Sequence, residues 1–293
     1  MNTTLNAQPV GYKAKSLQPK YVLIYLLINP VLWIVLSVLF SFRILPWEVS
    51  PTFIIVVSIL NFAPAITAFV LTAISDGKQG VKDLWGRLWT RHVSIRWLLI
   101  ALLIWPVVFL IVKLLAAVMD GTPFFPFFDP FDEMVALFPG GFLFAILLGL
   151  REDFGWFGYL LPRLQAKWNA LASSLVVGVF WGLIHLGNWL LPPGNPKRDD
   201  SFWAFVLQII LASILYAWLF NNTGGKLLPV TLAHAMSNTV GGLIAIPDSY
   251  LLYYNWALLI VVIPVVLIFG LKNLVRQKRE DVVEQERVHA MSD

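Results

Sequence analysis

Five polar side chains with chemical potential lie inside strongly apolar segments of this 293-residue chain. Glu152 and Asp153 share one such segment, His185 lies in a second, and His234 with Asn238 lies in a third. Ionisable groups at bilayer depth are costly to hold, so they mark functional-site candidates. Their presence on separate apolar segments predicts one shared polar pocket.

The carboxyl of Glu152 is the candidate general base, because a carboxylate held in a sheltered pocket suits proton abstraction. Neighbouring residues of a helix point about 100° apart, so Glu152 and Asp153 are expected to face different partners. The alternative for Glu152 is a structural ion pair with Arg151 or a polar contact between helices.

The segment that contains His185 carries Gly178, Trp181 and Gly182 at the spacing of one helix face. Two glycines one turn apart predict the close approach of a neighbouring helix. A lone buried histidine usually has a structural role, but the ionisable residues on the other segments need a partner, which favours a functional role for His185.

Thr231, His234 and Asn238 also share one helix face. His234 and Asn238 are one turn apart and can reach the same ligand. Two donors so placed could stabilise an oxyanion, or the imidazole could bind a metal. The alternative is hydrogen bonding between helices, which is common for Asn and His in membranes.

The composition indicates a polytopic membrane protein, since 58% of the residues are hydrophobic and only 13% are charged, against about a quarter charged in soluble domains. The chain has no cysteine, which excludes disulfides, thiolate ligands and cysteine nucleophiles. The net charge of +4 lies in short loops, which favours a basic cytoplasmic face over nucleic-acid binding.

About 20 apolar residues are needed to cross a bilayer. We therefore predict an all-α bundle of about eight transmembrane helices, with the fourth continuing through its charged residues because the apolar run resumes after them. The predicted spans are Tyr21–Phe42, Pro51–Ile74, Trp97–Met119, Phe138–Leu161, Asn169–Leu191, Phe202–Phe220, Leu227–Ile246 and Leu251–Leu271.

With both termini in the cytoplasm, the inner segments hold sixteen Lys and Arg residues and the outer segments three. This asymmetry predicts that orientation. We expect three parts along the chain: a tail with three accessory helices over residues 1–130, the catalytic core over 131–250, and the last helix with a charged tail over 251–293.

Three ordered motifs resemble those of the CPBP family, the CAAX-processing and bacteriocin-processing intramembrane proteases that are also called abortive-infection proteins. The family pattern is Glu-Glu-xxx-Arg, an aromatic residue four positions before a histidine, and His-xxx-Asn or His-xxx-Asp. The matching segments are Glu152–Gln165, Phe180–His185 and His234–Asn238. The chain has no Gly-x-Ser-x-Gly, no His-Glu-x-x-His and no aspartate pair on separate spans, which argues against serine, zincin and aspartyl mechanisms.

The resemblance implies that Glu152 activates water beside His185, while His234 and Asn238 stabilise the oxyanion. It leaves open whether zinc takes part, with Glu152, His185 and His234 as its ligands. The chain departs from the family pattern twice, with Asp153 at the second acidic position and Phe157 in place of the arginine.

The leading hypothesis is an intramembrane endopeptidase that acts on membrane-associated peptides, of CAAX or bacteriocin type, in the bacterial plasma membrane. The bilayer and such a substrate are its expected partners. Two alternatives stay open: a catalytically inactive scaffold or regulator, which Phe157 supports, and a proton-coupled transporter in which Glu152 and His185 form a relay. The sequence does not indicate an oligomeric state.

Overall fold

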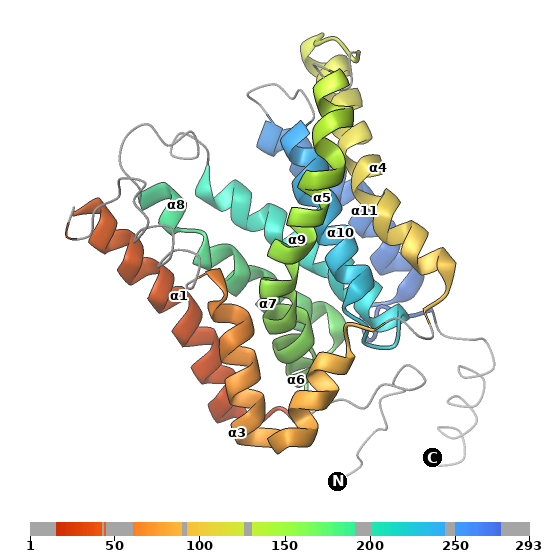
Figure 1. Ribbon diagram of the computed structural model, residues 1–293. Helices are drawn as coiled ribbons and strands as arrows, with labels where there is room; N and C mark the ends of the chain where they lie inside the picture. The colour runs from red at the N-terminus through yellow and green to blue at the C-terminus, as the bar shows by residue number, and fades with distance from the viewer. Residues whose placement is uncertain are drawn as a thin grey trace, which may run out of the picture.

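The computed structural model describes residues 16–42, 44, 61–89, 93–125, 131–190, 201–243 and 250–276, and these form helices and short connections without any strand (Figure 1). This arrangement confirms the predicted all-α fold. The helices are α1 (Pro19–Ser41), α3 (Ala63–Gly86), α4 (Ile95–Asp120), α5 (Phe131–Asp153), η1 (Phe154–Leu160), α6 (Leu161–Gln165), α7 (Ala170–Ile184), α8 (Gly187–Leu190), α9 (Phe202–Asn222), α10 (Leu228–Leu243) and α11 (Tyr250–Phe269).

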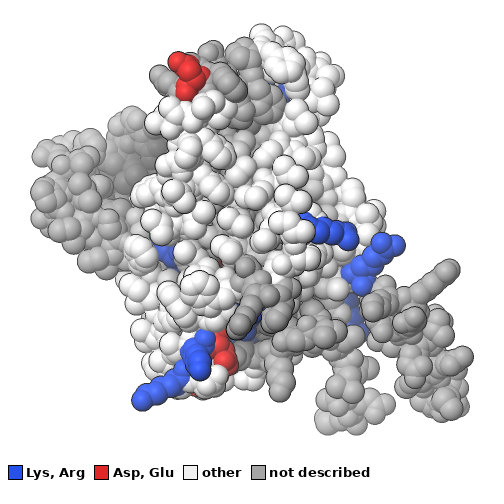
Figure 2. Space-filling view, turned by 45° about the vertical axis from the view of Figure 1, so that its right-hand side comes forward, with Lys and Arg blue, Asp and Glu red and all other residues white. Residues whose placement is uncertain are grey.

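The outer surface of the bundle is apolar. Five helical stretches are long and apolar enough to cross a membrane, among the described residues, and α7 is a shorter apolar helix. Large aliphatic side chains point outward, with Leu103 57% and Leu267 78% exposed. Figure 2 shows a broad uncharged surface that few charged side chains interrupt. The protein is therefore an integral membrane protein, as predicted.

A helix lies in each of the eight predicted spans, but the second span differs from its prediction. Residues 51–60 lie outside the described part of the chain, and α3 runs on to Gly86, through residues expected to form a loop. At Gly77 the backbone has φ 66° and ψ −163°, which breaks the helix inside α3. Glycine reaches this region without a steric penalty, so α3 can turn there without ending.

The fourth span is continuous through its charged residues, as predicted, but not as a uniform α-helix. α5 ends at Asp153 and is followed at once by η1, a seven-residue π-helix, and then by α6. All seven residues of η1 are buried, and η1 packs against α3. Short π-helical segments occur often at functional sites.

The close approach predicted from Gly178 and Gly182 is confirmed where α7 packs against α9. A Cβ on Gly178 would lie 2.5 Å from the Cα of Ile210, and one on Gly182 would lie 3.2 Å from a methyl of Val206. α7 ends at Ile184, so His185 caps the helix rather than lying within it. The polar residues at this end therefore lie at the terminus of a helix.

The second half of the bundle surrounds α10, which packs against α4, α5 and α9, while α11 packs against α4 and α9. Aromatic side chains fill the space between these helices, and Trp105, Tyr216 and Tyr254 are almost fully buried. The ring centroids of Phe109 and Tyr254 stack 5.0 Å apart. These five helices and α7 meet around one interior region, where the predicted site residues converge.

Candidate active site

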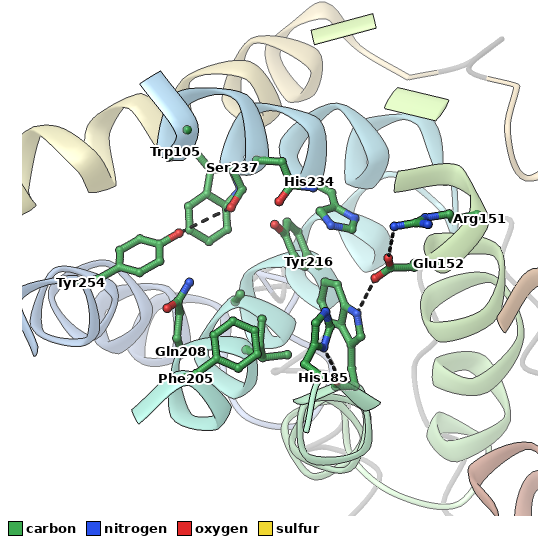
Figure 3. Close-up of a pocket in the computed structure, with 16 residues that line it drawn as sticks. Trp105, Arg151, Glu152, His185, Phe205, Gln208, Tyr216, His234, Ser237 and Tyr254 are labelled. Carbon is green, nitrogen blue, oxygen red and sulfur yellow. Dashed lines mark hydrogen bonds and ion pairs between the residues drawn. The ribbon is translucent and has the colours of Figure 1, made fainter. Parts of the chain in front are cut away.

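A cavity of about 420 Å³ opens between α4, α5, α7, α9, α10 and α11 (Figure 3). Four of the five predicted site residues line it: Glu152, His185, His234 and Asn238. They come from three separate elements, namely the end of α5, the C-terminus of α7 and the middle of α10. The structure therefore brings together the groups that the sequence had placed on separate spans.

The Glu152 carboxylate is held at both of its oxygens. The indole N–H of Trp181 donates to Oε2 at 2.7 Å, and Nη2 of Arg151 lies 3.3 Å from Oε1. Arg151 in turn donates from Nε to the Leu148 carbonyl at 3.0 Å. The ion pair considered from the sequence is thus present, and it leaves Glu152 on the cavity wall.

Asp153 turns away from the cavity and lies behind His234. Its side chain is fully buried, accepts a hydrogen bond from Thr231 Oγ1 at 2.7 Å, and lies 3.1 Å from Nδ1 of His234. Asp153 and Glu152 therefore face different helices, as the 100° step predicts. Asp153 does not line the cavity, so it can influence a group bound there only through the imidazole of His234.

His185 has a defined tautomer. Its Nδ1 lies 2.8 Å from the backbone carbonyl of Trp181. A carbonyl oxygen only accepts, so Nδ1 must carry a hydrogen, and in the neutral ring Nε2 is left as an acceptor. The ring also packs edge-on against Phe205, with centroids 5.2 Å apart.

His234 is enclosed by aromatic rings, with centroids 5.2 Å from that of Trp181 and 5.8 Å from that of Tyr216. Because Nδ1 is directed at Asp153, the opposite edge of the imidazole is the part available to the cavity. Asn238, one turn later on α10, also lines the cavity and is exposed. The two side chains can therefore act on the same bound group.

Residues 134–240 match the family model described as type II CAAX prenyl endopeptidase, Rce1-like. This segment is an Rce1-like domain. The match confirms the resemblance drawn from the sequence motifs. The chain is also similar to the protein named CAAX prenyl protease 2 of Methanococcus maripaludis, with 25% identity over 214 residues, which cover 70% of this chain and 78% of that protein.

Within the Rce1-like domain, Trp181 is the site residue whose role sequence reasoning missed. Its side chain donates to Glu152 and its carbonyl accepts from His185, so one residue orients both groups. The aromatic residue four positions before His185 in the motif was the available signal. Only the packing of α7 against the end of α5 shows that its N–H reaches a carboxylate.

Phe157, which replaces the arginine of the family pattern, lies in an aromatic cluster of the Rce1-like domain. It is fully buried, and its ring meets those of Trp181 and Tyr216 edge-on at 5.8 and 5.5 Å. The aromatic rings fill the space around this position. An apolar side chain at this position therefore supports Trp181 from behind instead of pairing with an acid.

The zinc ligand set considered from the sequence does not fit the described residues, where no three His, Cys, Asp or Glu side chains are grouped to hold a metal ion. The Glu152 oxygens contact Trp181 and Arg151.

Proposed function

We propose that this protein is an intramembrane endopeptidase that hydrolyses a peptide bond of a membrane-associated substrate with water activated by Glu152 and His185. One observation carries the proposal: a carboxylate, two imidazoles and an amide from three elements of an Rce1-like domain line a single cavity. Neither a transport path nor a packing contact requires that combination of groups.

The nucleophile would be a water held between two acceptors. Glu152 presents a carboxylate whose orientation is fixed by Trp181, and His185 presents Nε2 because its Nδ1–H is bonded to a carbonyl. A water that donates to both loses its proton to the carboxylate as its oxygen attacks the substrate carbonyl. The Arg151 guanidinium beside Glu152 offsets its charge between turnovers.

The tetrahedral intermediate would be stabilised from α10. The amide of Asn238 supplies one donor, and Nε2 of His234 supplies another when both ring nitrogens carry hydrogen. The Asp153 carboxylate, fully buried against Nδ1 of His234, provides the counter-charge for that form. Proton return from Glu152 to the leaving amine completes the hydrolysis.

Two observations support the substrate class: the position of the cavity inside a membrane bundle and the similarity to the relative. In this proposal a membrane-associated peptide enters the cavity from the bilayer. The similarity to a protein named CAAX prenyl protease 2 supports a peptide with a C-terminal CAAX-type sequence. A bacteriocin-type leader peptide is the second substrate class to be assayed.

The test is cleavage of membrane peptides by purified protein in detergent or lipid. We expect Glu152→Ala and His185→Ala each to lower kcat by at least about a hundredfold, the effect typical of losing a general base. Leu207→Ala, an exposed position on α9 outside the cavity, is the matched control. Cleavage that survives both cavity substitutions would refute the assignment. Metal dependence is tested separately, by measuring bound zinc and by assaying cleavage with and without a chelator.

A non-catalytic scaffold of the same fold is the second candidate, and Phe157 is the observation that favours it. In that case Glu152→Gln leaves the cellular phenotype unchanged while the protein accumulates to its normal level. Loss of the phenotype together with loss of peptide cleavage decides for the endopeptidase.

A further inference from the structure

His185 lies at a corner of the chain, and the helix that follows it is held by a part of the protein outside the Rce1-like domain. α7 ends at Ile184, and α8 begins at Gly187, two residues after His185. α8 packs against α1, and the two helices lie side by side in Figure 1. α1 spans Pro19–Ser41, whereas the family match covers residues 134–240. The segment that carries His185 is therefore supported by a helix that the family match does not include.

The two helices meet at Gly187 of α8 and Ser37 of α1, both of which are buried. A Cβ on Gly187 would overlap Oγ of Ser37, and it would lie 3.2 Å from the Cβ of Ser37. Oγ of Ser37 donates to the Trp33 carbonyl at 2.7 Å, so turning the hydroxyl away would break that bond inside the bundle. Even then, the two β-carbons would be too close. The distance between α1 and α8 thus depends on the absence of a side chain at Gly187.

α8 also contacts the aromatic ring that packs against the His185 imidazole. The ring centroid of Trp189 lies 5.1 Å from that of Phe202 and 5.1 Å from that of Phe205, both on α9. The Phe205 ring in turn meets the imidazole of His185 at 5.2 Å, as the pair labelled in Figure 3 shows. A displacement of α8 would therefore disturb His185 both through the backbone of the corner and through the Phe205 ring.

We propose that Gly187 and Ser37 are positioning residues, whose contact sets the distance between α1 and α8 and thereby orients the imidazole of His185 at the cavity. Neither residue is among those that line the cavity, so both would act through His185. The consequence for catalysis rests on the proposed endopeptidase function, because misplacement of a catalytic group by a fraction of an ångström lowers the rate of the chemical step. The orientation of the imidazole does not depend on that function.

The first experiment observes His185 directly and requires no substrate. The chain has only four histidines, so a protein labelled with ¹⁵N-histidine gives few ring signals, and those of His185 are identified by their loss in His185→Gln. The Nδ1–H tautomer, bonded to the Trp181 carbonyl, predicts distinct shifts for the two ring nitrogens. We expect Gly187→Ala to shift or broaden these signals. Gly141→Ala is the matched control, since a Cβ on Gly141 would meet nothing within 4 Å.

Rescue tests whether the effect arises at this contact. Ser37→Gly removes Oγ and Cβ together, so the nearest atom to the added methyl becomes the Trp33 carbonyl oxygen at 3.7 Å, an ordinary contact. The double variant Gly187→Ala with Ser37→Gly should therefore recover the wild-type signals of His185. Ser37→Val enlarges the same contact from α1 and should repeat the change with the sequence of α8 intact, which also serves if Gly187→Ala does not fold.

The second experiment measures cleavage of membrane peptides by the same variants. We expect Gly187→Ala to lower kcat by about tenfold with KM within about twofold of the wild type, because the base is displaced while the substrate-binding walls are kept. The double variant should regain most of the lost kcat. A change in stability alone would lower the unfolding midpoint and leave kcat per folded molecule unaltered.

The two readouts separate this proposal from the endopeptidase assignment. Unchanged His185 signals in both Gly187→Ala and Ser37→Val overturn the positioning role, whatever the activity, and so does a change that Ser37→Gly does not reverse. Altered signals with an unaltered kcat also overturn it, since the contact then has no part in catalysis. If the wild-type protein cleaves no peptide, the endopeptidase is contradicted, and the spectra alone decide whether this contact orients His185.

Discussion

Two buried ionic clusters lie along the same membrane helix, and they differ in what surrounds them. Glu152 and Asp153 lie at the end of α5 beside the cavity, whereas Arg163 lies ten residues farther on, in α6. Arg163 forms an ion pair with Asp76 of α3. Both clusters carry charge inside the bundle, so burial of charge alone does not distinguish them.

The guanidinium of Arg163 is enclosed, although its partner Asp76 is 14% exposed. Nη1 of Arg163 donates to the Tyr159 carbonyl at 3.1 Å, and the guanidinium lies over the Tyr159 ring, 3.8 Å from its centroid. Its side chain is only 3% exposed, and it does not line the cavity. This cluster joins α6 to α3 and fixes the end of the span.

Under the proposed function, the opening onto a cavity, and not the charge itself, distinguishes Glu152 from the structural Arg163. Glu152 keeps an edge on a space that can admit water and substrate, although Arg151 and Trp181 contact it. Arg163 and Asp76 satisfy each other. Substitutions in the two clusters should therefore separate activity from stability.

The largest expected effect is on catalysis. Glu152→Gln keeps the size and the Trp181 contact but removes the base, so we expect kcat to fall by about 10²–10⁴. The thermal unfolding midpoint in detergent should stay close to that of the wild type, because the pair with Arg151 is partly open to the cavity. A variant that loses stability in parallel with activity would contradict the distinction.

Next in size is the effect on stability. Asp76→Asn leaves the Arg163 guanidinium buried without its counter-charge, which costs about 3–5 kcal/mol of unfolding free energy. The activity per folded molecule should be kept at low temperature. The double variant Asp76→Leu with Arg163→Met removes both charges and should recover much of the loss, as measured by denaturation in mixed micelles.

A smaller effect is expected at Asp153. Asp153→Asn retains a partner for Thr231 but removes the counter-charge of His234, so we expect kcat to fall about tenfold to a hundredfold with little change in KM. The protein should still fold. Combining this variant with His234→Ala should add little to the loss from His234→Ala alone, since Asp153 acts through that ring; an additive loss would refute this.

The smallest expected effect concerns Trp181. Trp181→Phe keeps an aromatic ring against His234 and Phe157 but removes the N–H that holds Glu152, which lowers kcat/KM by about tenfold. Trp203→Phe, at a position 70% exposed on α9, controls for the general loss of an indole. Equal activities of the two variants would show that the Trp181–Glu152 bond has no part in catalysis.

Much of the fold could be predicted because lipid imposes long apolar helices whose length and periodicity are written in the sequence. The shared face of Thr231, His234 and Asn238 and the close approach at Gly178 follow from helix spacing in the same way. The partners of those faces depend on how the helices assemble. For that reason the bond from Trp181 to Glu152 and the placement of Asp153 behind His234 could not be predicted.

Arg163 shows why the sequence misleads at the end of a span. Its position after an apolar run predicts a solvated cytoplasmic loop, yet the side chain is buried, because Asp76 lies on the part of α3 that continues past its predicted end. The break at Gly77 within α3 was not visible in the apolar pattern. Other residues that line the cavity, such as Gln208 and Tyr254, belong to no motif in the sequence.

The π-helix between the two clusters sets their relative phase. A wider turn over Phe154–Leu160 absorbs extra chain, so the stretch before it can direct carboxylates toward α7 and α10 while the stretch after it directs a guanidinium toward α3. Deleting one residue there would rotate the side chains of the following helix, including Arg163, by about a quarter of a turn around the helix axis. The side chains before and after the deletion could then no longer contact α7, α10 and α3 at the same time.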